Sequence, residues 1–240
     1  MRLGKSTLAA ALATTVVLGA SACGSKDDDG GSNGFTDKSA EDIKNAAIDD
    51  MKDVTSLTME GTITSDGKEQ KLKLSSSTDG KCAGEITVSG GTAQFISGEE
   101  SFLKGDDAFW NGVAGSPAAA QQILTLVGDK WAKVPPGQGG FDSFCDLDNM
   151  LEDFTKDDSD GDVKKGDTDD IDGTEAIELT GKTDDGDTSH AWVATEGDHF
   201  ILKLEAEGSQ PGSFTFTDYN EPVDADAPPA EQVVDLSQRG

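Results

Sequence analysis

The stretch DVTSLTMEGTITSDGKEQKLKLSS, residues 53–76, alternates between apolar and polar side chains on both sides of one tight turn. Its apolar positions are separated by even numbers of residues within each half: Leu57, Met59, Ile63, Leu72 and Leu74. Asp66-Gly67, between the two halves, is a dipeptide typical of a hairpin turn. A period of two with one apolar face predicts paired antiparallel strands whose other face meets water.

Short strands of the same kind are predicted at residues 84–89, 91–97, 100–104, 175–180, 189–195, 200–206 and 213–219. Helices are predicted at 38–51, where Ser39 and Asp42 resemble a capping box, and at 118–127, where Pro117 takes the first helical position. Four apolar side chains at helical spacing predict another helix: Phe144, Leu147, Leu151 and Phe154. Helices segregated from antiparallel strands define an α+β fold.

The charge of the chain is strongly one-sided. Its 240 residues include 47 acidic and 19 basic ones, for a formal net charge of −28 at pH 7. Such a chain repels the phosphate backbone, so nucleic acid is excluded as a partner. The segment 157–172 is rich in Asp but does not have the ligand spacing of an EF-hand, and we interpret it as a solvated acidic loop, with weak cation binding as the alternative.

The N-terminus has the pattern of an export signal. Arg2 and Lys5 precede an apolar stretch, residues 8–22, that is too short to span a bilayer. The stretch ends in Gly19-Ala20-Ser21-Ala22-Cys23-Gly24, which resembles the lipobox of bacterial lipoprotein precursors. The resemblance implies that residues 1–22 are a signal peptide and that Cys23 receives a diacylglyceryl group. The alternative is an ordinary secretory signal that carries a cysteine near its cleavage site.

The remaining chain divides into three parts. Residues 23–37 are Gly-, Ser- and Asp-rich and predict a flexible tether. Residues 38–223 hold the predicted helices and strands, and residues 224–240 form a C-terminal tail. Three apolar side chains offer a way to dock that tail on the domain: Val233, Val234 and Leu236.

Two cysteines remain once Cys23 is assigned to lipid. In a chain exported from the reducing cytosol, Cys82 and Cys145 predict a disulfide. The alternative is a metal or redox pair, which the lack of a CxxC spacing argues against.

The order of predicted elements resembles that of actinobacterial LolA/LppX-type lipoproteins. The resemblance is carried by Cys23, by residues 53–61 (DVTSLTMEG), by residues 102–110 (FLKGDDAFW) and by residues 130–134 (KWAKV). It implies a curled antiparallel half-barrel sheet with helices packed in its concave face. It also implies that large apolar side chains line a binding site for a hydrophobic ligand such as an acyl chain: Phe102, Phe109, Trp110, Trp131, Phe144, Leu147, Leu151 and Phe154. The alternative for each is that it fills the core.

No sequence motif indicates catalysis or a cofactor. The chain has no GxSxG or HExxH motif, and its Asp and Glu pairs single out no acid and base. His190 and His199 flank the turn at Gly197-Asp198 and could face each other across a hairpin, but two histidines leave a metal site incomplete. We interpret both as solvent-facing strand residues, and expect no metal, no cofactor and no enzymatic activity.

The sequence therefore predicts a monomeric lipoprotein anchored through Cys23 on the extracytoplasmic face of the cell membrane. The function implied by the resemblance is binding or transfer of a lipid or another hydrophobic ligand. The alternative is a cell-surface interaction or scaffold lipoprotein, with a filled core and an acidic face that meets a basic partner or cations.

The anchor is tested by Cys23→Ser, which removes the thiol that would carry the lipid. We expect the variant to move from the membrane fraction to the soluble fraction on ultracentrifugation, because two acyl chains are lost. Continued membrane association of the variant would contradict the anchor.

Overall fold

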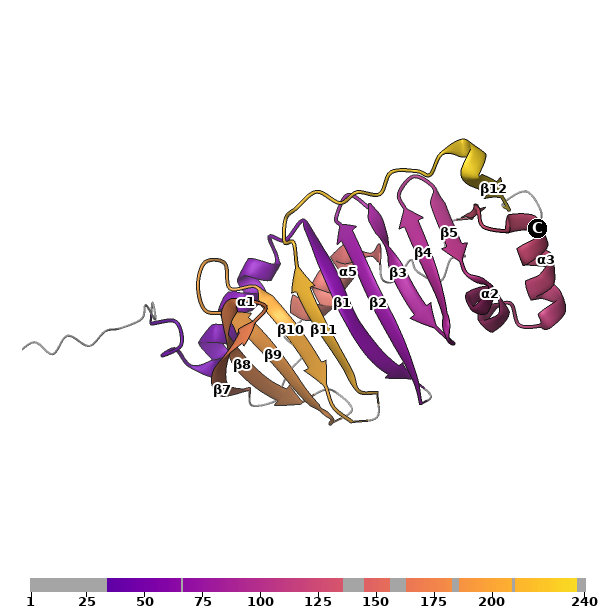
Figure 1. Ribbon diagram of the computed structural model, residues 1–240. Helices are drawn as coiled ribbons and strands as arrows, with labels where there is room; N and C mark the ends of the chain where they lie inside the picture. Colours follow the sequence, from indigo (N-terminus) through magenta and orange to yellow (C-terminus); the bar gives the residue numbers. More distant parts are fainter. Residues whose placement is uncertain are drawn as a thin grey trace, which may run out of the picture. The chain divides into compact units, whose positions relative to one another are not determined.

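The computed structural model describes residues 34–65, 67–135, 145–155, 163–182, 186–208 and 210–236, without the side chains of residues 65 and 153–155. All of them lie in one compact unit, residues 32–240. Within this unit a long sheet and a small number of helices form a mostly-sheet α+β fold (Figure 1). Cys23, the predicted signal peptide and most of the predicted tether lie outside the described residues.

Twelve strands form the sheet in the order β12-β6-β5-β4-β3-β2-β1-β11-β10-β9-β8-β7. Their bounds are β1 Ser56–Ser65, β2 Lys68–Ser77, β3 Cys82–Val88, β4 Gly91–Ser97, β5 Ser101–Gly105, β6 Trp131–Val134, β7 Lys164–Ile171, β8 Thr174–Lys182, β9 Thr188–Ala194, β10 Ile201–Ala206, β11 Gly212–Thr217 and β12 Val233–Asp235. Neighbours are antiparallel except β12 and β6, which are parallel. The sheet is open, with β12 and β7 at opposite edges.

The hairpin predicted in residues 53–76 is confirmed. Ser65 of β1 lies opposite Lys68 of β2, so the turn holds two residues, and Gly67 has the positive φ that such a turn needs (+70°). This hairpin occupies the middle of the sheet. The chain before β6 extends it on one side through β3, β4 and β5, and the chain after residue 163 extends it on the other through β11 to β7.

In the part of the chain that the structure describes, four α-helices accompany the sheet: α1 Ala40–Met51, α2 Asp107–Val113, α3 Pro117–Val127 and α5 Leu147–Thr155. The capping box of α1 is confirmed, because Ser39 Oγ accepts a hydrogen bond from Asp42 N (3.1 Å) and donates one to Asp42 Oδ2 (2.7 Å). Ser116 Oγ caps α3 in the same way, accepting from Ala119 N at 3.2 Å. The three predicted helices thus occur; α2 was not predicted.

The interpretation of residues 157–172 as a solvated loop is wrong over its second half, because residues 164–171 form the edge strand β7. β7 pairs with β8 through a turn in which Asp172 and Gly173 both have positive φ (52° and 90°). Six of its eight residues are exposed, so it lacks the alternation that marks a half-buried strand. Charged side chains on an edge strand hinder pairing with another chain, which accounts for a strand made of polar residues.

Both ends of the described chain are fastened to the domain. Val233 of the tail pairs with Trp131, and Leu236 packs against the core, so the tail docks through the expected apolar residues. At the other end Phe35 is 2% exposed, and Lys165 Nζ donates hydrogen bonds to the carbonyl oxygens of Thr36 and Lys38 (2.6 and 2.8 Å). The packed part of the chain therefore begins within the predicted tether, at residue 35.

The strand register divides the sheet into an apolar face and a polar face. Cross-strand neighbours share a face, and one such row runs across the sheet from β11 to β6: Phe216, Met59, Leu74, Gly84, Phe95, Leu103 and Ala132. The row on the opposite face is polar for most of its length: Thr215, Glu60, Lys73, Glu85, Gln94 and Lys104. The main core consists of the apolar face and the helices packed on it.

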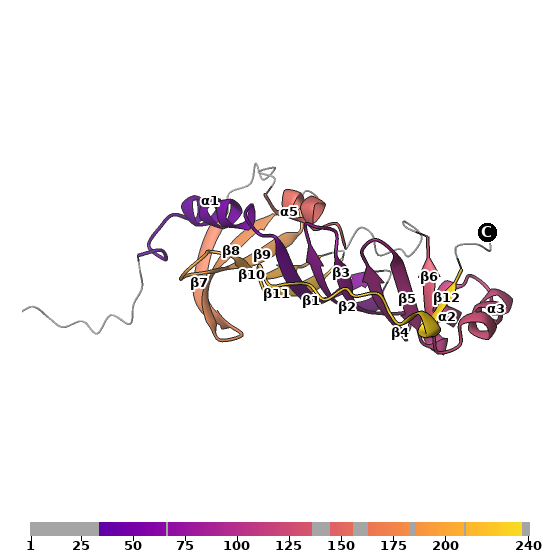
Figure 2. The same cartoon turned by 90° about the horizontal axis from the view of Figure 1, so that it is seen from above.

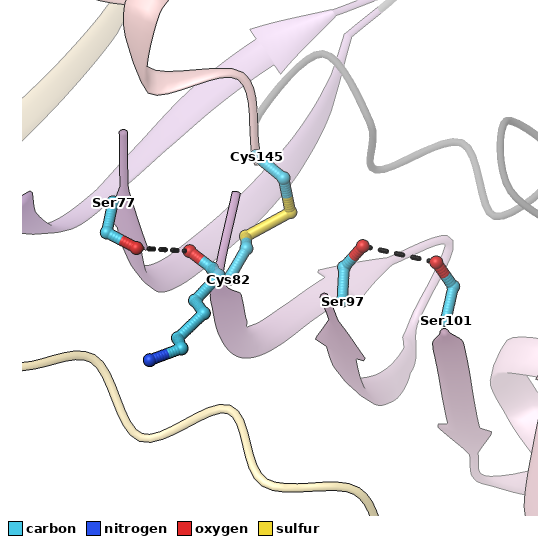
Figure 3. The surroundings of a disulfide bond; sticks show 6 residues. Ser77, Cys82, Ser97, Ser101 and Cys145 are labelled. Atoms are coloured by element: carbon cyan, nitrogen blue, oxygen red, sulfur yellow. Dashed lines mark hydrogen bonds between the residues drawn. A yellow bond between two sulfur atoms is a disulfide. The ribbon is translucent and has the colours of Figure 1, made fainter. Parts of the chain in front are cut away.

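The structure contains the predicted disulfide between Cys82 and Cys145 (Figure 3). Cys82 opens β3 on the apolar face, and Cys145 lies two residues before α5. The bond closes a loop of 63 residues, which in the chain-entropy model stabilises the fold by about 4 kcal/mol. It ties the start of α5 to the sheet.

Gly91→Ala tests how closely α2 approaches the sheet. A Cβ on Gly91 would lie 1.9 Å from the backbone nitrogen of Phe109, so the helix would have to shift. We expect a loss of about 2–3 kcal/mol in the free energy of unfolding, measured by urea denaturation. Gly98→Ala is the matched control, because a Cβ there meets no atom within 4 Å. Equal stability of the two variants would contradict this packing.

Candidate functional site

The candidate site is the helix-bearing apolar face of the sheet. Two pairs of helices contact each other there: α1 with α5, and α2 with α3. The first pair lies over the half of the sheet that contains β1 and β7 to β11, and the second lies by β5, β6 and β12 (Figures 1 and 2). The cover of this face therefore consists of two separate pieces.

Four of the eight predicted lining residues are buried in the core on this face, two on α2 and two on α5. Phe109 and Trp110 of α2 pack edge to face, with ring centroids 5.2 Å apart. Leu147 and Leu151 of α5 are 1% and 7% exposed and belong to the same core cluster. The helices thus carry the large apolar side chains that could contact a ligand, and in this structure those side chains are buried.

Two of the other four predicted lining residues, Phe102 and Trp131, lie elsewhere. Phe102 pairs with Lys133 and Ile96, and Trp131 pairs with Val233, so the register puts both aromatic side chains on the opposite face from Phe95. Phe144 and the side chain of Phe154 lie outside the described residues. Phe102 and Trp131 therefore do not line the same surface as the α2 and α5 residues.

The polar face has open hollows rather than an apolar site. One of about 330 Å³ is lined in part by Ile96 and Trp131, and one of about 670 Å³ by Lys104, Asp107 and Asp129. A third, of about 560 Å³, lies between Phe102 and residues 225–227, where the C-terminal segment passes the strand ends (Figure 1). The last two have several charged lining residues, whereas the hollow at Ile96 and Trp131 is lined mainly by apolar residues, with Lys73 and Glu85 at its border.

Surface ion pairs on this face shift three pKa values. The carboxylate of Glu60, 2.8 Å from Lys73 Nζ, raises the pKa of Lys73, and Glu100 does the same for Lys133. The hydroxyl of Ser77 donates to Asp79 and lowers the pKa of that carboxyl. All three groups are in contact with water, so these pairs contribute little to stability.

A hydroxyl-bearing row on the apolar face was not singled out from the sequence. Cross-strand pairing puts Ser76, Cys82, Ser97 and Ser101 side by side. Ser97 Oγ and Ser101 Oγ are 3.1 Å apart (Figure 3), whereas Ser76 Oγ is buried and has no hydrogen-bond partner among the described residues. The sequence did carry a signal, because Ser76 continues the alternate positions of Leu72 and Leu74 and so occupies an apolar position of β2.

The interpretation of the histidines as solvent-facing strand residues holds for His190, which the register puts on the polar face of β9 opposite Thr180 and Glu205, whereas His199 lies outside the strands. Both side chains are 22% exposed, and each is paired with a carboxylate: His190 Nδ1 is 2.6 Å from Glu178 Oε1, and His199 Nδ1 is 3.0 Å from Asp50 Oδ2. His190 pairs in the sheet with Glu205 rather than with His199. His199 also stacks on Phe35, with centroids 3.8 Å apart, and so helps hold the start of the domain.

Among the described residues, no group of three or more His, Cys, Asp or Glu side chains is arranged to hold a metal ion. No helix in the same part of the chain is long and apolar enough to cross a membrane.

No family profile and no curated protein sequence matches the chain. Two solved structures share its fold. The lipoprotein LppX of Mycobacterium tuberculosis aligns with a TM-score of 0.52 and 16% identity, over 78% of this chain and 98% of LppX. LprF of Mycobacterium bovis aligns with a TM-score of 0.57 and 11% identity, over 79% of this chain and 96% of LprF. The expected likeness to LppX is thereby confirmed for the α+β fold, but the sheet is open, so the expected curl into a half-barrel is not confirmed.

Tyr219 provides a spectroscopic test of packing at the edge of this core, because it is the chain's single tyrosine. Its hydroxyl donates to the carbonyl of Ile201, its ring stacks on Phe200 at 4.3 Å, and burial raises its pKa above the usual value of 10.0. A raised pKa favours the protonated phenol in the folded state, so its contribution to stability is present below pH 10 and falls as the pH rises further.

We expect phenolate absorbance at 295 nm to appear only at the alkaline pH where circular dichroism reports unfolding. In urea the same group should titrate near pH 10. Phenolate formation near pH 10 in a protein with native circular dichroism would refute this burial.

Proposed function

We propose that the protein is a monomeric lipoprotein, anchored through Cys23 on the extracytoplasmic face of a cell membrane, that binds or transfers a lipid or another hydrophobic ligand without catalysing a reaction. In this proposal residues 1–22 are removed on export, and the tether holds the domain near its membrane. The ligand occupies the space between the apolar face of the sheet and the helices.

The observation that carries the proposal is the divided cover of the apolar face. α1 contacts α5 and α2 contacts α3, and in this proposal one of these pairs moves away from the sheet without unfolding it. The Cys82–Cys145 disulfide holds the start of α5 while the rest of the helix moves. The edge strands β12 and β7 do not pair with each other. In this proposal the open sheet curls around the ligand into the half-barrel expected from the resemblance.

The fold and the N-terminal sequence support the same proposal independently. LppX, which shares the fold, is a lipoprotein, and this chain has the lipobox-like sequence at residues 19–24. Apolar contacts with an acyl chain would supply affinity of about 0.8 kcal/mol for each buried CH₂ group.

The filled core favours the second candidate, a surface interaction or scaffold lipoprotein. Leu147 and Leu151 are nearly inaccessible, which is what a core without a ligand space requires. The two candidates make opposite predictions about bound lipid.

We expect the Cys23→Ser chain, recovered from the soluble fraction of its own host, to carry about one lipid per chain, measured by solvent extraction and mass spectrometry. Leu151→Trp in the same chain should lower that occupancy, because a larger side chain on α5 fills the space beneath the helix. Leu126→Trp is the matched control, since Leu126 is 42% exposed on α3.

Absence of lipid from all three chains would contradict the carrier function and would support the scaffold candidate instead. Equal occupancy in all three would mean that the ligand lies elsewhere than beneath α5.

A further inference from the structure

Two adjoining hollows lie on the polar face of the sheet, away from the proposed lipid site. The smaller, of about 330 Å³, and the larger, of about 670 Å³, share the lining residues Glu85 of β3 and Gln94 of β4. These two residues are cross-strand neighbours. The hollows therefore border each other and form one surface, the Gln94 site, whose volume is of the order that holds a small ligand.

The smaller hollow presents an aromatic ring next to aliphatic groups. Its lining includes Trp131, which is half-buried, and the cross-strand neighbours Ala83 and Ile96. Trp131 belongs to β6, which is paired with β5 on one side and with β12 on the other. The indole is thus carried by a strand held within the sheet, and such elements position a binding group more precisely than loops do.

The polar side chains of the site are unused by the fold. Glu85, Gln94 and Lys104 follow one another in one cross-strand row, and their side chains make no hydrogen bond or ion pair with any described residue. In the same row Lys73 is paired with Glu60 at 2.8 Å. The site therefore offers a carboxylate, an amide and an ammonium group, which together donate and accept hydrogen bonds.

The length of the site indicates a chain of linked units rather than a single small molecule. Glu85 lies on β3 and Trp131 on β6, and these strands are separated by β4 and β5. Three strand spacings amount to about 14 Å.

Charge argues against an anionic ligand. Four carboxylates line the larger hollow, from Glu85, Asp106, Asp107 and Asp129, against the single ammonium group of Lys104. A phosphate or carboxylate group there would be repelled.

A cation and an acyl chain fit the smaller hollow no better. Lys73 and Glu85 both line it, so their charges oppose each other beside the indole. Both hollows are open to solvent, and an acyl chain lying in them would stay in contact with water. The ligand that fits is neutral, apolar on one side and rich in hydrogen-bonding groups.

Sugars that carry an N-acetyl group combine these properties. The C–H groups on one side of a sugar ring can pack on the apolar body of an indole, while the hydroxyls donate and accept hydrogen bonds. The acetamide adds a methyl group, which suits Ala83 and Ile96. It also adds an N–H that matches the carboxylate of Glu85 and a carbonyl that matches the amide of Gln94.

We infer that the Gln94 site binds a neutral polysaccharide of N-acetylated sugars. Trp131 stacks on one sugar ring, and Glu85, Gln94 and Lys104 bond the polar groups along the chain. This activity is separate from the proposed lipid binding, because the two sites lie on opposite faces of the sheet.

Isothermal titration calorimetry with chitotetraose, a neutral chain of four N-acetylglucosamine units, tests the assignment. For the full chain carrying Cys23→Ser we expect a dissociation constant of about 0.1 mM. Cellotetraose, which has the same linkage but hydroxyls in place of the acetamides, should bind about tenfold more weakly because it lacks the methyl and amide groups. Free N-acetylglucosamine should give no measurable heat of binding, since it spans only part of the site.

Two variants of the same chain locate the binding site. Trp131→Leu keeps an apolar side chain but removes the ring, and should weaken chitotetraose binding about tenfold. Gln94→Ala should weaken it about fivefold, since one hydrogen-bonding group is lost. Gln122→Ala is the matched control, because Gln122 is exposed on α3 and lines neither hollow. Gln94→Ala and Gln122→Ala should both unfold at the urea concentration of the parent chain.

No measurable binding of chitotetraose by the parent chain would overturn the assignment and would favour a protein partner for this face. Unchanged binding in Trp131→Leu and Gln94→Ala, or an equal loss in Gln122→Ala, would overturn it by placing the glycan elsewhere. Equal affinity for cellotetraose would overturn the assignment to N-acetylated sugars. None of these outcomes bears on the proposed lipid binding, which the extraction of bound lipid tests separately.

Discussion

Burial of the apolar face of the sheet is the constraint on which the other features depend. The face runs across strands from both halves of the chain, and water must be kept from its Leu, Met and Phe side chains. Strands cannot do this for an open sheet, so helices supply the cover: α1 from the start of the domain, and α2, α3 and α5 from its middle. The disulfide links one of these helices to the sheet at a fixed point.

The negative charge is distributed in accordance with this division into faces. Residues 142–187 contain 18 acidic and 4 basic residues, and part of that segment forms the edge strand β7. An acidic edge discourages pairing with a second copy of itself. If the protein is anchored beside anionic lipids, repulsion also disfavours approach of this strand to the bilayer within about 8 Å at physiological salt.

A carrier of a polar-headed ligand and a scaffold differ in whether the core contains buried polar atoms that lack a hydrogen-bond partner. Most of this core is closely packed, which alone would suit either function. The unpartnered atoms of Ser76 and Trp110 are the exceptions, and both lie on the side of the sheet that the helices cover. Polar groups of this kind reduce the stability of the empty protein, and that cost is offset when a ligand with an acceptor group is bound.

Sequence reasoning worked where a local signal was present. The alternation in residues 53–76 predicted the central hairpin, Ser39 and Pro117 marked the starts of two helices, and export together with two remaining cysteines predicted the disulfide. It failed for β7, whose polar residues have no alternation because the strand lies at an exposed edge. It also missed the carboxylate partners of the histidines, which come from residues 12 and 149 positions away.

By itself the sequence determined the class of fold, the residues of the hairpin and the two faces of the strands that it predicted, because a strand's side chains alternate whatever it pairs with. The tertiary structure alone decided which strands are neighbours, since pairing in a sheet joins residues far apart in the chain. That pairing separated Phe102 and Trp131 from the α2 and α5 residues with which they had been grouped. It also brought Ser76, Ser97 and Ser101 into one row, through contacts between strands that no local pattern records.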